Sequence, residues 1–136
     1  MAALTKGRNT PMRSGDISEP PVAANVVIFA GAQVAINAAG NAVPMSTATT
    51  LVGLGRAEET VDNTGGAAGD KRVRTGRGIY RFANSTSTDA ITRADIGNDC
   101  YGVDDQTVAK TNGANTRSKA GKVFDVDADG VWVKFS

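Results

Sequence analysis

β-Branched side chains outnumber leucine so strongly in this chain that they set its fold class. The 136 residues include 14 Val and 6 Ile but only 3 Leu. A branched Cβ restricts the rotamers open to a helical residue and suits the pleated, half-buried surface of a sheet. The composition therefore predicts an all-β protein.

Length and apolar content together predict one domain with a thin core. A chain of 136 residues is long enough to bury a core but too short for two large ones. Leu, Ile, Val and Phe account for only 27 residues, but a formal net charge of +1 is too small to indicate disorder. We expect ordered strands joined by long connections rich in Gly, Ala and Thr.

Residues 1–21 predict an extended N-terminal arm. They contain prolines and glycines, which oppose helix, and few large apolar side chains. A segment without a core-facing stripe must dock on another surface or stay mobile. The cations of this arm are Lys6, Arg8 and Arg13.

Short apolar or alternating segments, separated by turn residues, predict strands along residues 22–136. The expected strands are 26–29, 33–37, 42–45, 50–57, 71–82, 100–103, 106–110, 122–126 and 131–135. Glycines within 50–57 indicate a bulge or a close backbone approach. Short strands at this spacing are typical of sandwiches, barrels and jelly rolls. We expect a small domain of the jelly-roll or β-sandwich type.

Three connections carry more specific expectations. Residues 39–41 predict the turn of an early hairpin, and Asn112-Gly113 predicts another, because both of these residues tolerate positive φ. Residues 85–96 contain the one short helical turn that we expect, with Ser87 or Thr88 as its N-cap.

The segment Asp-Val-Asp-Ala-Asp-Gly at 125–130 matches the opening of a calcium-binding loop. Such a loop also needs a bidentate Glu at position 12 and a helix on each side. Position 12 is Ser136, and both flanks favour strands. Asp-Gly is a common hairpin dipeptide, so we expect a β-turn, with a calcium site as the alternative. The next strand then has Val131, Val133 and Phe135 on one face and Trp132 and Lys134 on the other.

Histidine and the familiar catalytic motifs are missing, so we expect no enzyme, no cofactor and no metal site. The chain has no histidine, the commonest general base and a common metal ligand. No phosphate-loop pattern occurs, and the Asp104-Asp105 pair is expected to belong to a loop. The single cysteine, Cys100, is expected to be a small buried hydrophobe.

Hydropathy and charge give no reason to expect export, a membrane or nucleic acid. No run of about 18 apolar residues occurs, and the N-terminus lacks the apolar part of a secretory signal. A net charge of +1 gives no general field for polyanions. We expect synthesis in the cytoplasm, with no direct nucleic-acid partner and no membrane partner.

The basic stretch at 71–81 has three interpretations. Cations beside aromatic rings can bind nucleic acid, but Glu58, Glu59, Asp62 and Asp70 offset the positive field. A solvated strand face and a surface that docks on an acidic protein are the two stronger interpretations, and the sequence does not choose between them. The arginines of this stretch are Arg72, Arg74, Arg77 and Arg81.

Two stretches carry a family resemblance. Residues 94–109 read ADIGNDCYGVDDQTVA, and residues 116–133 run from TRSKAGKV to DVDADGVWV. Both resemble the capsid cement, or head decoration, proteins of tailed bacteriophages. They cover about a third of the chain, and they are structural rather than catalytic motifs.

The resemblance implies a jelly-roll virion protein on the outer surface of an icosahedral head, where it ties neighbouring major capsid proteins together. Binding across each seam would stabilise the shell against the pressure of packaged DNA. Copies at symmetry axes would pair, so a homo-oligomer is implied, a dimer before a trimer. The capsid-contact candidates are Lys6, Arg8, Arg13, Arg72, Arg74, Arg77 and Arg81.

The alternative function is a small β-barrel module that binds nucleic acid or polysaccharide through residues 71–81. Nucleic-acid binding by several cations weakens steeply with salt, whereas shell binding through mixed contacts weakens less. Salt dependence therefore separates the two.

Overall fold

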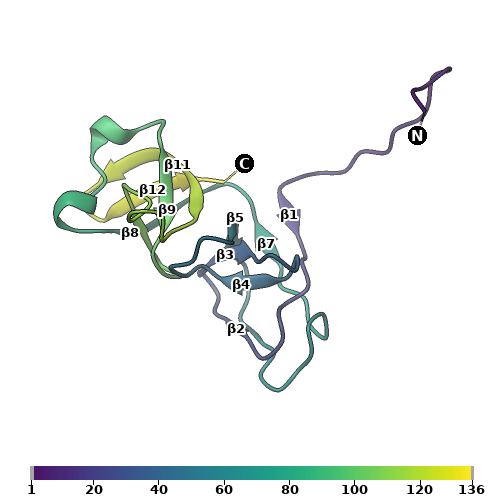
Figure 1. Ribbon diagram of the computed structural model, residues 1–136, viewed down its shortest axis with the longest axis horizontal. Helices are drawn as coiled ribbons and strands as arrows, with labels where there is room; N and C mark the ends of the chain where they lie inside the picture. Colours follow the sequence, from purple (N-terminus) through teal and green to yellow (C-terminus); the bar gives the residue numbers. More distant parts are fainter. Residues whose placement is uncertain (1, 136) are drawn as a thin grey trace.

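Strands make up nearly all the regular structure in the computed structural model, which describes residues 2–135 (Figure 1). In chain order they are β1 Ile17–Ser18, β2 Val27–Ile28, β3 Gln33–Ile36, β4 Ala42–Pro44, β5 Val52–Ala57, β6 Val61–Asp62, β7 Thr75–Gly76, β8 Ile79–Asn84, β9 Asp99–Gly102, β10 Thr107–Ala109, β11 Lys119–Asp127 and β12 Gly130–Lys134. Two 3-10 turns, η1 Ser87–Asp89 and η2 Arg93–Asp95, are the helical part of this range. The predicted class, a small all-β domain of the jelly-roll type with hardly any helix, is confirmed.

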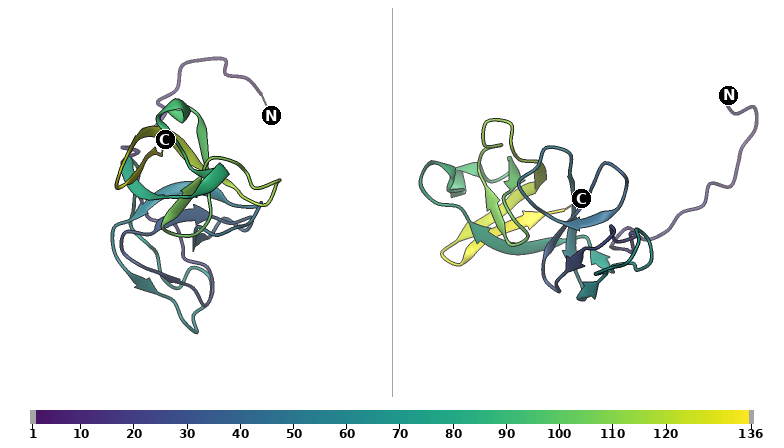
Figure 2. Two further views of the ribbon diagram at one scale, coloured as in Figure 1. Left: turned by 90° about the vertical axis from the view of Figure 1, so that its left-hand side faces the viewer. Right: turned by 60° about the horizontal axis from the view of Figure 1, so that its bottom comes forward.

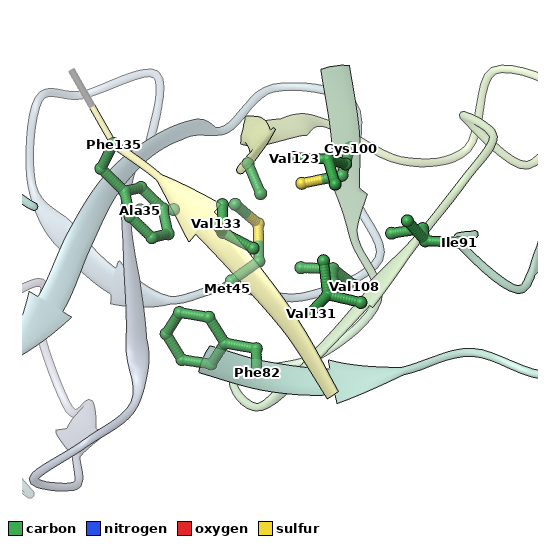
Figure 3. Close-up of a cluster of buried hydrophobic side chains, with 11 residues drawn as sticks. Ala35, Met45, Phe82, Ile91, Cys100, Val108, Val123, Val131, Val133 and Phe135 are labelled. Atoms are coloured by element: carbon green, nitrogen blue, oxygen red, sulfur yellow. The ribbon is translucent and has the colours of Figure 1, made fainter. Parts of the chain in front are cut away.

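Five strands of the C-terminal half close into a small barrel. Their order is β10-β8-β12-β11-β9, and β8 and β10 pair in parallel. Strand alternation sets Val131 and Val133 of β12 opposite Phe82 and Tyr80 of β8, and both valines are fully buried. Figure 3 shows these valines and Phe82 converging with Met45 in the barrel core.

The N-terminal half forms an antiparallel sheet with a core of its own. The strand order is β1-β7-β5-β3-β4, and β2 and β6 make a separate pair beside it. The buried amide of Asn63 anchors the loop after β6, since Nδ2 donates to the carbonyls of Ala23 (3.0 Å) and Ala67 (3.1 Å). The core residues of this half are Val22, Ile28, Ala32, Val34, Ala42, Leu54, Ala57, Val61 and Val73.

A glycine and a glutamine join the sheet to the barrel. A Cβ on Gly53 of β5 would clash with the Ala120 carbonyl of β11, so glycine permits this approach of the two backbones. The fully buried Gln33 of β3 donates from Nε2 to the carbonyls of Asp104 (2.7 Å) and Thr107 (3.0 Å), at the entry to β10. These contacts tie the two halves together.

Two predictions for the N-terminal half are confirmed. Strands β3 and β4 pair as a hairpin, and Gly40 in its turn has a φ of +84°. The glycines of β5 mark both a bulge and close approaches. Val34 and Ala35 of β3 pair with Gly55 and Gly53, which leaves one extra residue on β5.

The basic stretch at 71–82 is not the single strand that the sequence predicts. It breaks after Gly76, so that β7 belongs to the sheet and β8 to the barrel. Ile79 is 37% exposed, although it is a large apolar residue, because the β8 register sets it opposite Lys134 on the outside of the barrel. A run of alternating residues cannot reveal that the chain changes sheet within it.

Two predicted connections are also wrong in detail. Asn112-Gly113 does not join a hairpin, because β10 pairs with β8 and β9 rather than with β11, and residues 113–115 all have positive φ in a longer loop. Residues 85–96 hold two 3-10 turns instead of one, with Thr86 and Thr92 as N-caps. None of the helical turns in residues 2–135 has the length or hydropathy to cross a bilayer.

Residues 2–15 extend away from the folded body, as Figures 1 and 2 show, and all of their side chains are exposed. The chain joins the fold at Asp16, whose carbonyl accepts a hydrogen bond from the Arg77 amide (2.8 Å). It continues as β1, which pairs with β7, and as a bridge between Pro21 and Arg72. The last residues of the predicted arm, 16–21, are therefore part of the sheet.

Candidate docking surface

The seven predicted contact cations lie in separate places rather than along one strand. Within residues 2–135, the salt bridges include only one of them, Arg81. Lys6 and Arg8 are on the arm, Arg13, Arg72 and Arg77 line a groove at the base of the arm, Arg81 is on the barrel, and Arg74 is exposed outside that groove.

The arm exposes apolar and basic side chains together. Leu4 is 69% exposed and Met12 is 98% exposed, and Lys6 and Arg8 lie between them in the sequence. Burial of large apolar side chains away from water is favourable, and Leu4 and Met12 are not buried against the folded body of their own chain. The arm is therefore suited to pack on another surface.

The groove at the base of the arm has a volume of about 700 Å³ and is lined by three guanidinium groups. Arg13 comes from the arm, Arg72 from the segment before β7, and Arg77 from the residue after it. Ile36 of β3 and Leu54 of β5 add apolar surface to the same groove. We call this the arginine groove.

The pairing of β1 with β7 explains why arginines distant in sequence share this groove. Val73 and Thr75 are fully buried, so strand alternation turns Arg72 outward. Arg77, just past the end of β7, is placed by the hydrogen bond from its amide to the Asp16 carbonyl. The side chain of Arg72 is also fixed by a hydrogen bond, because its Nη1 donates to the Glu19 carbonyl (2.9 Å). Glu19 is also the carboxylate among the residues that line the groove.

On the outer face of the barrel, Arg81 and Trp132 form a fixed pair. They lie opposite each other on β8 and β12, with the guanidinium carbon 5.7 Å from the centre of the indole ring. Arg81 also lies 3.8 Å from the Asp129 carboxylate. The predicted faces of β12 are confirmed, because Val131 and Val133 are buried while Trp132 is partly exposed.

A second groove, of about 430 Å³, reaches from Trp132 to Tyr80 and Arg56, and we call it the aromatic groove. The Arg56 guanidinium lies 4.2 Å from the centre of the Tyr80 ring. The sequence did not single out Arg56 or Trp132 as site residues. Their approach depends on the β8–β12 pairing and on the junction of sheet and barrel, for which no local pattern exists.

Residues 125–130 contain the predicted β-turn between β11 and β12. The Asp127 carboxylate accepts hydrogen bonds from the indole of Trp132 (2.9 Å) and from the amides of Asp129 (2.8 Å) and Gly130 (3.1 Å). These bonds, that of the indole first, hold the pKa of Asp127 below its ordinary value. The carboxylate thus orients the tryptophan on the barrel face.

The geometry of this turn differs from a calcium loop, whose flanks are helices. Asp125 is engaged by Arg93, with Nη1 and Oδ1 2.6 Å apart. Ser136, at position 12 of the pattern, lies outside the described residues. Within residues 2–135, no group of three or more His, Cys, Asp and Glu side chains is placed to hold a metal ion.

Cys100 is fully buried in the barrel core, as predicted. Burial raises the pKa of its thiol to about 11, so the group stays protonated at neutral pH. Because the thiolate is the reactive form of cysteine, Cys100 is a packing residue.

Comparison with family models, with curated proteins and with solved structures finds no match to this chain. Any proposal about function therefore depends on the arm, the two grooves and the resemblance of the C-terminal stretches.

Proposed function

We propose that this protein is a structural, non-catalytic virion protein that binds the outer surface of an icosahedral phage head and cements neighbouring major capsid proteins. The observation that carries the proposal is the arm, because residues 2–15 extend from a body that is folded without them. The resemblance of residues 94–109 and 116–133 to capsid cement proteins supplies the kind of partner.

An arm of this composition suits a seam between two subunits. The body binds one capsid subunit while the arm reaches the next, so each bound copy adds its binding free energy to that seam. Lys6 and Arg8 attract an acidic surface, and Leu4 and Met12 become buried on contact. The conformational entropy of the arm is lost only on docking, where these contacts offset it.

Self-association belongs to the same proposal. The seams of an icosahedral shell repeat around symmetry axes, and copies bound at a two-fold axis meet through the same patch. We therefore propose a dimer as the bound form, with a trimer at three-fold positions as the alternative.

Co-sedimentation tests the proposal. Purified protein is mixed with assembled heads, whose major capsid protein comes from the same genome, and in parallel with single-stranded DNA. The salt concentration is varied from about 50 to 200 mM, over which contacts to several phosphates weaken steeply. We expect saturable binding to heads at a fixed ratio of copies to capsid subunits. Binding to DNA alone, with a steep salt dependence, would overturn the proposal.

One observation favours a second candidate, a binding module for polysaccharide or nucleic acid. The aromatic groove combines Arg56, Tyr80, Arg81 and Trp132, and aromatic rings beside cations stack on sugars or bases. Trp132 is the single tryptophan of the chain, so its fluorescence reports on this groove. A saturable change in emission with dextran or with an oligonucleotide would support the second candidate, and an unchanged spectrum would oppose it.

A further inference from the structure

The arginine groove is an unbalanced concentration of positive charge. Arg13, Arg72 and Arg77 line it together with one carboxylate, that of Glu19. None of the three arginines forms a salt bridge within the part of the chain that the structure describes. Guanidinium groups pair with carboxylates in planar, two-point contacts, so this lining is complementary to acidic side chains.

The remaining lining indicates a peptide rather than a nucleic acid. Ile36 and Leu54 give the groove an apolar part, and β1, the outer strand of the sheet, lies beside it. Among the described residues, no aromatic side chain lines the groove to stack on a base. An extended peptide alternates its side chains, so it can direct carboxylates to the arginines and apolar groups to Ile36 and Leu54.

We propose that the arginine groove binds an extended acidic segment of a partner protein, in which acidic and apolar residues alternate. The inference rests on the proposed function for the identity of that partner, which is then the major capsid protein. The groove lies where the arm leaves the sheet, so an acidic segment bound there would fix the direction in which the arm departs.

A peptide titration tests the groove without heads. The probe is an eight-residue peptide of alternating Glu and Val with a fluorescent label, followed by anisotropy with the full chain. Arg77→Glu is the test variant, since no side-chain hydrogen bond or salt bridge of Arg77 is found within residues 2–135. Arg74→Glu is the matched control, because it reverses the same charge three positions away but outside the groove.

We expect saturable binding of the acidic peptide by the unchanged protein, at least about tenfold weaker binding by Arg77→Glu, and binding within about twofold for Arg74→Glu. Adding Arg13→Glu to Arg77→Glu is expected to weaken binding further. Equal losses in Arg74→Glu and Arg77→Glu would reduce the effect to net charge and overturn the inference. Tighter binding of an eight-nucleotide thymidine strand than of the peptide would also overturn it.

The two proposals can fail separately. If heads bind the unchanged protein and Arg77→Glu equally well, the groove is not the contact and the cement function stands. If the acidic peptide binds at the groove but heads do not bind at all, the groove stands and the cement function fails. Melting temperatures of all variants, measured first, confirm that each protein is folded.

Discussion

Gly53 is the residue at which sheet and barrel come closest, and it supports a sharp test. We expect Gly53→Ala to destabilise the fold by about 1 to 3 kcal/mol, as overpacking of a filled site does. The added methyl would meet the Ala120 carbonyl, a backbone atom that cannot rotate away. Urea unfolding measures the change. Gly7→Ala is the control, since a Cβ there meets nothing, and equal stability of the two variants would contradict the close approach.

Individual residues show where the sequence was informative. The burial of Val131, Val133 and Cys100 could be predicted, because apolar side chains at alternate positions of a strand share the face that packs against the core. The exposure of Ile79 could not, since it depends on which residue of another strand lies opposite. The same holds for Gln33, a polar side chain that is fully buried because distant carbonyls accept its hydrogen bonds.

The β11–β12 hairpin should respond to acid through Asp127. Its carboxyl pKa is lowered in the fold, so it stabilises the protein above its ordinary pKa near 3.8, and this stabilisation is lost as the pH falls through the lowered value. We expect Asp127→Asn to melt below the unchanged protein at pH 7. The gap should begin to narrow below about pH 4, where the unfolded chain takes up a proton, and it should close as the pH falls through the lowered pKa of the folded carboxyl. A gap that stays constant with pH would contradict this role.

The arm should be separable from the fold at Asp16 and not later. Deletion of residues 2–15 is expected to leave the melting temperature unchanged and to weaken head binding. Deletion of 2–21 is expected to lower stability by about 1 kcal/mol for each backbone hydrogen bond lost. Among those lost are Val73 N to the Pro20 carbonyl (3.1 Å) and Ala42 N to the Pro21 carbonyl (2.7 Å). Thermal melts compare the two, and equal melting would contradict the boundary.

At the level of elements, local patterns were sufficient for the two hairpins, β3–β4 and β11–β12, because turn residues and alternation lie within a few positions. They were insufficient for residues 71–82, which change from sheet to barrel at Gly76. The candidate site could not be predicted for the same reason, since it depends on a pairing between distant strands. The sequence named Arg13, Arg72 and Arg77 among seven candidate contact cations, but only the pairing of β1 with β7 brings these three into one groove.

Over the whole molecule, Gln33 links the two cores. We expect Gln33→Leu to destabilise the protein by about 1 to 3 kcal/mol, because the Asp104 carbonyl loses its side-chain donor and the Thr107 carbonyl keeps only the Val103 amide. Gln106→Leu is the control, because Gln106 lies between Asp104 and Thr107 in the chain but its side chain is exposed. Denaturant melts followed by Trp132 fluorescence and by far-ultraviolet circular dichroism compare the variants. An unchanged midpoint for Gln33→Leu would contradict the link.

The position of β12 between β8 and β11 also sets an order of events during synthesis. The core of the N-terminal half draws on residues 22–73, so it is complete while the barrel strands are still emerging from the ribosome. β8 and β11 have open edges until β12 arrives, and the barrel closes last. Pulsed hydrogen exchange on nascent chains should protect residues 22–73 before β8. Simultaneous protection would show that the cores form together.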